Sequence, residues 1–90
     1  MIDVKEATQI ALSYFEELYG EDAFSNVLLE EVERDEEDGT TYWFITIGFT
    51  ERRQRGPLGQ LAPSRRYKRF KIDAETEEVV SMKIRSVENA

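Results

Sequence analysis

Apolar and polar residues alternate along this chain with two different periods. Between Asp3 and Gly20 the apolar residues fall on one broad arc at 100° per residue, and polar residues fill the opposite arc. This segregation predicts an amphipathic helix packed on a larger surface, with Phe15 and Leu18 in the core. Asp3, followed three residues later by Glu6, is typical of a capping box. Gly20 is predicted to end the helix in the left-handed conformation.

A period of two residues follows the predicted helix. Residues 26–35 alternate imperfectly, which favours a strand with a bulge, or an edge strand with both faces partly covered. Asp38-Gly39 predicts a hairpin turn. The next strand, 41–50, has an apolar face formed by Trp43, Ile45, Ile47 and Phe49. Residues 65–73 and 79–87 complete the set of strands, and the last strand is predicted to point Val80, Met82 and Ile84 inward.

The predicted order is one helix and then four strands joined as an antiparallel meander. We therefore predict a single α+β domain over residues 1–90, with the N-terminal helix packed on a four-stranded antiparallel sheet. The other face of such a sheet lies toward solvent. Residues 52–64 contain Gly56-Pro57, Gly59 and Pro63, which predict a long loop between the second and third strands.

The chain contains no cysteine and no histidine. Serine and cysteine triads that use histidine and the common zinc sites are therefore excluded. No glycine-rich phosphate loop follows a predicted strand. The acidic run at 33–39 fails the EF-hand pattern, because Arg34 and Ile45 would occupy ligand positions. We predict a protein that is not an enzyme, with no catalytic residues, no metal and no cofactor; an enzyme built on paired carboxylates is the third hypothesis.

The net charge of −7 is unevenly distributed. Residues 1–51 hold fourteen acidic and two basic residues, whereas residues 52–71 hold eight basic residues and no acidic one. The eight are Arg52, Arg53, Arg55, Arg65, Arg66, Lys68, Arg69 and Lys71. This basic arm on an acidic body has two interpretations. It binds an acidic protein surface or phosphate groups, with Tyr67 available for stacking, or it pairs with acidic strands of the same chain or of another copy.

The predicted strand 41–50 carries aromatic residues on both faces. Tyr42 and Phe44 lie on the face opposite Trp43. Either the long loop covers these rings through Leu58 and Leu61, or the rings meet a partner, which includes a second copy of the chain.

The segment Phe70-Lys-Ile-Asp73-Ala-Glu-Thr-Glu-Glu-Val79-Val80 resembles the strand–turn–strand signature of PepSY-type domains. The helix ending in Gly20 suits the same order. The resemblance implies a cystatin-like wrap of strands around one helix, and a non-catalytic binding or inhibitory module. Glu77 stands where the family usually has a glycine, and nothing here directs export, although PepSY domains are typically exported. The cystatin Gln-x-Val-x-Gly loop is absent, so inhibition of cysteine proteases is not expected.

The leading hypothesis is a small non-enzymatic protein-interaction or regulatory module whose partner is an unknown protein or a second copy. The alternative is binding of nucleic acid or a phosphate ligand through residues 52–71, which the acidic body opposes. The candidate binding residues are Arg52, Arg53, Arg55, Arg65, Arg66, Lys68, Arg69, Tyr67, Tyr42 and Phe44. We expect a cytoplasmic protein without membrane attachment, because the sequence shows no signal peptide and no apolar run of the ~20 residues that a span needs.

Overall fold

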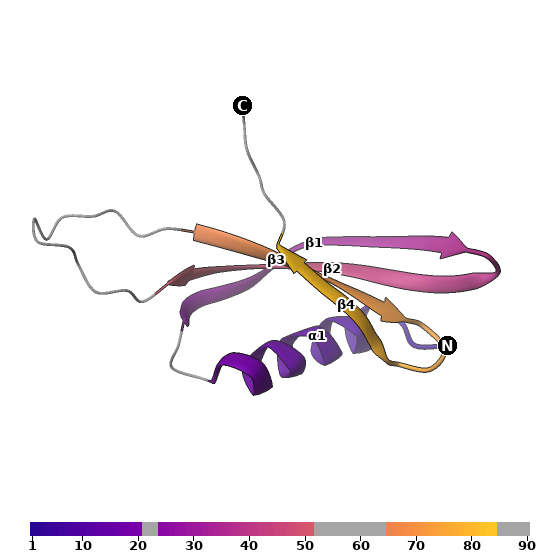
Figure 1. Ribbon diagram of the computed structural model, residues 1–90, viewed down its shortest axis with the longest axis horizontal. Helices are drawn as coiled ribbons and strands as arrows, with labels where there is room; N and C mark the ends of the chain where they lie inside the picture. The colour runs from indigo at the N-terminus through magenta and orange to yellow at the C-terminus, as the bar shows by residue number, and fades with distance from the viewer. Residues whose placement is uncertain (21–23, 52–64, 85–90) are drawn as a thin grey trace, which may run out of the picture.

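The computed structural model describes residues 1–20, 24–51 and 65–84. The helix α1 (Val4–Tyr19) precedes four strands: β1 (Phe24–Glu37), β2 (Thr40–Glu51), β3 (Arg65–Asp73) and β4 (Val79–Ile84). The strands form one antiparallel sheet in the order β1-β2-β3-β4, and α1 lies along one face of it (Figure 1). The predicted α+β arrangement is confirmed. The predicted loop 52–64 lies outside the described residues.

Local hydrogen bonds fix both ends of α1. The Asp3 carboxylate accepts from the Glu6 N–H at 2.9 Å, and the Glu6 carboxylate accepts from the Asp3 N–H at 3.2 Å. The predicted capping box is confirmed. Gly20 has φ 88 and ψ 161, so its φ is positive but its ψ is extended. The predicted left-handed cap is therefore wrong in ψ, and the chain leaves the helix extended while the Gly20 N–H still donates to the Glu16 C=O at 2.8 Å.

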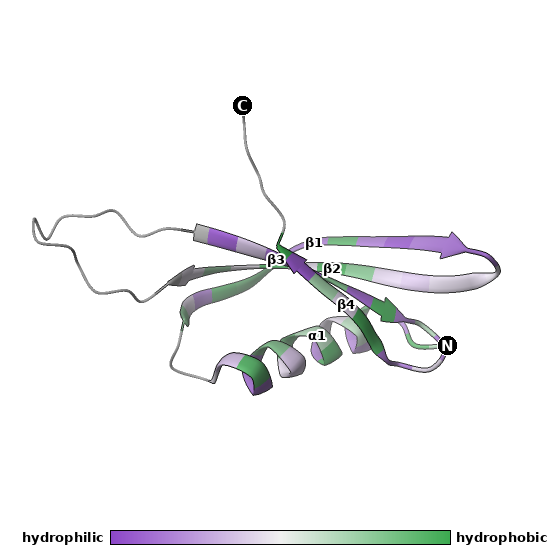
Figure 2. Ribbon diagram, in the orientation of Figure 1, coloured by the Kyte–Doolittle hydropathy of each residue, from purple (hydrophilic) through white to green (hydrophobic). Residues whose placement is uncertain are grey.

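The core lies between α1 and the helix-facing side of the sheet. The buried residues of α1 are Ala7, Ala11 and Phe15, and the large buried apolar residues of the sheet are Ile45, Ile47, Phe49, Phe70 and Ile72. The Phe15 ring centroid lies 5.0 Å from that of Phe49 and 5.4 Å from that of Phe24. Each large apolar side chain that is fully buried stabilises the fold by roughly 1.5–3 kcal/mol. Apolar residues gather on α1 and the strands above it, while β1 is hydrophilic near the turn (Figure 2).

The apolar arc of α1 is narrower in the structure than the sequence pattern predicts. Phe15 is 3% exposed, but Leu18 is 49% exposed and Val4 is 40% exposed. The prediction that Leu18 belongs to the core is wrong. The helix packs on β2 and β3, so apolar residues at the flanks of its arc find no strand beneath them.

A bulge changes which residues of β4 face the core. Ser81 pairs with Lys71 and Val79 pairs with Ile72, which leaves Val80 as an extra residue. Val79 and Met82 therefore pack against the core, as predicted for Met82. Val80 is 49% exposed, so the prediction that it faces the core is wrong. Ile84 lies on the side of α1, opposite Lys68, as predicted, but it is 74% exposed and does not join the core.

Ile2 ties the N-terminal segment to the sheet. The side chain of Ile2 is buried. Its N–H donates to the Ala74 C=O at 2.8 Å, and its C=O accepts from Trp43 Nε1 at 3.1 Å. The N-terminus thus lies beside the turn between β3 and β4 (Figure 1).

Candidate interaction surface

The sheet separates the basic residues of β3 onto its two faces, because neighbouring residues of a strand point to opposite sides. Lys68 and Arg66 lie on the side of α1, where they pair in register with Ile47 and Phe49. Arg69 and Lys71 lie on the other side, which we call the outer face. The basic arm that the sequence predicts is therefore not one continuous surface within β3.

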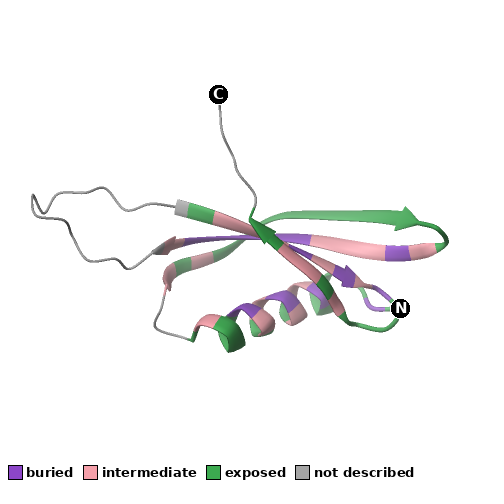
Figure 3. Ribbon diagram, in the orientation of Figure 1, coloured by how far each residue is buried: buried purple, intermediate pink, exposed green. Residues whose placement is uncertain are grey.

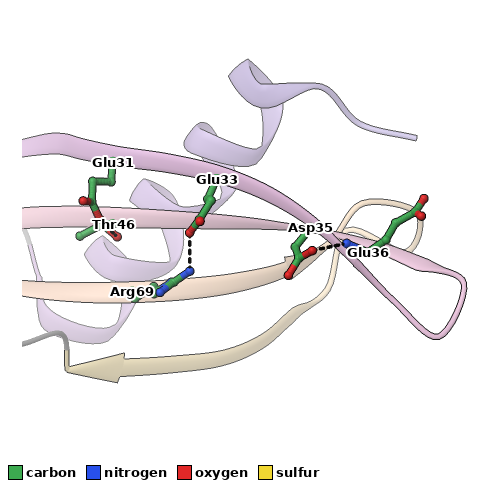
Figure 4. A network of polar contacts seen from close by, with 6 residues as sticks. All are labelled: Glu31, Glu33, Asp35, Glu36, Thr46 and Arg69. Carbon is green, nitrogen blue, oxygen red and sulfur yellow. Dashed lines mark hydrogen bonds and ion pairs between the residues drawn. The ribbon is translucent and has the colours of Figure 1, made fainter.

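Arg69 covers an aromatic ring of the outer face. Its guanidinium carbon lies 4.5 Å from the ring centroid of Phe44. Its Nη2 donates to Oε1 of Glu33 on β1 at 2.7 Å (Figure 4). A cation over an aromatic ring contributes about 0.5–1 kcal/mol at exposed sites and about 2 kcal/mol when desolvated. Arg69 therefore connects side chains of three neighbouring strands on this face, from β3 across β2 to β1.

Lys71 repeats this arrangement one step toward the hairpin turn. Its Nζ lies 4.3 Å from the Tyr42 ring centroid and 2.8 Å from Oε1 of Glu37. The hydrogen bond with Glu37 raises the pKa of the Lys71 ammonium above its ordinary value, and this effect exceeds the opposing effect of burial. Lys71 therefore stays charged through the neutral range and holds its place over the ring.

The candidates Tyr42 and Phe44 are half-buried beneath these two basic side chains. Thr46 and Gly48, further along the same face of β2, are buried. The predicted covering residues Leu58 and Leu61 lie outside the described residues. Arg69 thus forms an ion pair with Glu33 of the same chain. Pairing with acidic strands of the same chain was one of the two interpretations of the basic arm.

The remaining candidates do not gather at one place. Lys68 Nζ lies 5.5 Å from the Tyr19 ring centroid. It lines a hollow of about 170 Å³ with Tyr19, Phe24, Phe49, Arg66, Tyr67 and Ile84. Arg65 begins β3 opposite Thr50. Arg52, Arg53 and Arg55 lie outside the described residues.

A wider groove of about 630 Å³ runs between α1 and the turn that precedes β4. Glu6, Glu17, Glu77 and Glu78 line it, and all four are exposed. Within the part of the chain that the structure describes, no three acidic, histidine or cysteine side chains are placed to hold a metal ion. The helix of this part also lacks the length and apolar character that crossing a membrane requires.

Sequence reasoning missed the exposed surface of β1. Every residue of β1 from Leu28 to Glu37 is exposed (Figure 3), so the prediction that both faces of an edge strand are partly covered is wrong for this stretch. Leu28, Leu29 and Val32 are 56%, 44% and 39% exposed. The acidic residues of the same stretch are Glu30, Glu31, Glu33, Asp35, Glu36 and Glu37. The imperfect alternation was the signal in the sequence, because it favoured either a bulge or an edge strand.

The edge position and the bulges of β1 are as the sequence suggests. β1 is the first strand in the order of the sheet, so one of its edges faces away from β2. The register shifts between Ser25 and Leu28, and again between Leu29 and Glu31. From Glu31 to Glu37 the pairing with β2 runs without interruption. β1 thus consists of an irregular first half and a regular, acidic second half.

Comparisons with protein-family models, with curated proteins and with solved structures found no match to this chain. The resemblance to PepSY-type domains therefore stays a prediction. The geometry of the described surfaces is the basis for assigning a function.

Proposed function

We propose that this chain is a small non-enzymatic protein-interaction module that binds a positively charged segment of another protein through β1. One observation carries the proposal: β1 is exposed from Leu28 to Glu37 although it carries three large apolar residues. Leu29 and Val32 lie on the same face of β1, because they pair with Ile47 and Ile45, and exposed apolar patches tend to mark interaction sites. This surface replaces the Tyr42–Phe44 face as the candidate, because basic side chains already lie over those rings.

The charge of β1 determines the kind of partner. Six acidic residues surround the three apolar ones, and the whole chain carries a net charge of −7. Such a surface attracts a basic segment and repels an acidic one. The ion pairs of Glu33 and Glu37 leave these carboxylates 67% and 46% exposed, so both remain accessible to further donors.

The same charges disfavour the alternative of nucleic-acid binding. Arg69 and Lys71 are engaged with carboxylates of β1. Phosphate binding through 52–71 would have to break these pairs or depend on the other basic residues of the segment, against the negative field of the body. We therefore favour a protein partner. A cytoplasmic location is part of the proposal, and the absence of cysteine fits a reducing compartment.

The turn before β4 supports the proposed relation to PepSY-type domains. Glu77, which stands where the family usually has a glycine, has φ 66. A positive φ favours glycine. The local backbone therefore suits the family's turn although the residue differs, and the relation fits a non-catalytic module.

Binding of a fluorescent lysine–valine peptide tests the function. We expect the double variant Asp35→Asn/Glu36→Gln to weaken binding about tenfold, since 1.4 kcal/mol corresponds to a factor of ten. The matched control Glu16→Gln/Glu17→Gln removes the same charge from the exposed face of α1. It should weaken binding less than about twofold. Equal effects of the two variants, or no binding by the unaltered protein, would contradict the proposal.

A further inference from the structure

The hairpin turn fixes which backbone groups of β1 are free. Asp38 and Gly39 have φ 50 and 82, so both central residues of this two-residue turn have the positive φ of a type I′ turn. The residues that flank such a turn exchange hydrogen bonds, and bonded and non-bonded pairs alternate from there. Glu37 and Thr40 are therefore a bonded pair. Glu36, Arg34 and Val32 direct their N–H and C=O groups away from β2.

Two hydrogen bonds of the structure agree with this alternation. The Glu36 N–H donates to Oδ1 of Asp35 at 2.9 Å instead of to β2 (Figure 4). Thr41 pairs with Glu36 in register, and its C=O accepts from the Ala74 N–H at 3.0 Å, beyond the other edge of β2. Both residues of this pair thus turn their backbone groups away from each other, as a non-bonded pair must.

We propose that the partner adds to the sheet as a further strand along the outward edge of β1 between Val32 and Glu36. The inference rests on the proposed function and specifies its binding mode. An extended segment that joins a sheet edge gains affinity from backbone hydrogen bonds and specificity from alternating side chains. The N–H groups of Val32 and Arg34, and the C=O groups of Val32, Arg34 and Glu36, supply the bonds.

The segment of β1 that can pair with a further strand is limited at both of its ends. Two register shifts interrupt β1 before Glu31, and bulges disrupt the ladder and twist an edge away from pairing. At the other end, the Asp35 carboxylate already occupies the Glu36 N–H. The segment that can accept a strand is therefore short and regular.

The two faces of this segment define the partner's sequence pattern. Glu31, Glu33 and Asp35 share the outer face, because they pair with Thr46, Phe44 and Tyr42. Val32, Arg34 and Glu36 share the other face, because they pair with Ile45, Trp43 and Thr41. A strand that lies along this edge places its alternate side chains beside the carboxylates and beside Val32. Basic residues suit the positions beside the carboxylates, and an apolar residue suits the position beside Val32.

A second copy of the chain is a poor occupant of the same edge. Its own β1 would bring another row of carboxylates beside Glu33 and Asp35, and like charges on neighbouring strands destabilise pairing. Charged edges of this kind protect natural sheets against self-association. The acidic residues of this edge therefore favour a basic segment of another protein over a second copy of the chain.

Backbone methylation separates ladder formation from charge attraction. The probes are an octapeptide of alternating lysine and valine, and the same peptide N-methylated at its central residues. We expect the methylated peptide to bind at least about tenfold more weakly, because its side chains and charge are unchanged while its ladder donors are gone. The unmodified peptide should slow amide exchange of Val32 and Arg34 about tenfold or more. The Glu33 amide, already directed to β2, should change little.

Each other outcome overturns the inference in a distinguishable way. Equal binding of both peptides would mean attraction through side chains alone, so the proposed function would stand without the added strand. Protection of Val32 and Arg34 without peptide, rising with protein concentration, would assign the edge to a second copy. Binding of neither peptide would overturn both the function and its mode.

Proline variants test the edge from the side of the protein. Proline is tolerated on edge strands where its missing N–H faces solvent. Val32→Pro should therefore keep the far-ultraviolet circular dichroism of the fold and lose peptide binding, whereas Val32→Ala keeps most of both. Glu33→Pro should destabilise the sheet, because it removes a donor directed to β2. Peptide binding by Val32→Pro equal to that of Val32→Ala, or unfolding of Val32→Pro as severe as that of Glu33→Pro, would contradict the inference.

Discussion

Arg69 of β3 contacts Phe44 of β2 and Glu33 of β1 on the outer face, and its removal gives a quantitative test of what stabilises that face. Arg69→Met keeps the aliphatic stem and removes the guanidinium. The variant loses the stacking on Phe44 at 4.5 Å and the ion pair with Glu33 at 2.7 Å. Glu33 is 67% exposed, so water and salt screen the ion pair strongly.

The expected loss of stability follows from these two contacts. A cation over a ring contributes about 0.5–2 kcal/mol, and an exposed ion pair contributes about 0.2–1 kcal/mol. With Arg69 itself only 32% exposed, we take about 1–2 kcal/mol as the sum. For a domain of this size, that lowers the melting temperature by about 4–16 °C.

Urea unfolding followed by the fluorescence of Trp43, the single tryptophan, measures this loss. Arg69→Lys is the matched control, because it keeps the charge but loses the planar group that stacks. In about 1 M salt, the stability difference between the unaltered protein and Arg69→Met should shrink only by the contribution of the ion pair. A double-mutant cycle with Phe44→Leu isolates the stacking. A coupling free energy below about 0.3 kcal/mol would refute the claim that the contact between Arg69 and Phe44 stabilises the fold.

Three further predictions follow from other contacts. Glu77→Gly should stabilise the protein by up to about 1 kcal/mol in the same unfolding assay, because φ 66 strains a residue with a Cβ while glycine costs some unfolded-state entropy. The N–H groups of Thr76 and Glu75 donate to Asp73 and lower its pKa, so Asp73 stabilises the fold above the ordinary aspartate pKa. The stability difference between the unaltered protein and Asp73→Ala should therefore shrink as pH falls through the lowered pKa, and urea midpoints over a pH series measure it. Phe15→Ala should cost about 3–5 kcal/mol, which calorimetry detects as a lost or strongly lowered transition, whereas Phe15→Leu should cost less.

Local chemistry made much of the fold predictable. The capping box of Asp3 and Glu6 and the turn at Asp38-Gly39 depend on a few adjacent residues, and both occur as predicted. The third strand is also as predicted, at Arg65–Asp73. Such features depend on local backbone preferences, which a sequence carries directly.

Features that depend on distant pairing were not predictable in the same way. The exposure of Leu18 depends on which strands α1 covers, and the exposure of Val80 depends on a bulge between β3 and β4. The candidate surface shows the same limit. Tyr42 and Arg69 were both singled out, but only the register of β2 and β3 reveals that basic side chains lie over the aromatic rings.

The bonds of Ile2 have a consequence for the order of folding. The three hairpin contacts of the meander join strands that are neighbours in the sequence, whereas Ile2 bonds to Ala74, near the other end of the described chain. Contacts of long sequence separation carry a larger loop-closure cost and form late. We therefore expect the strands to pair first and the helix to dock last. Because the Trp43 indole donates to Ile2, stopped-flow fluorescence of this one residue would time the final step of the reaction.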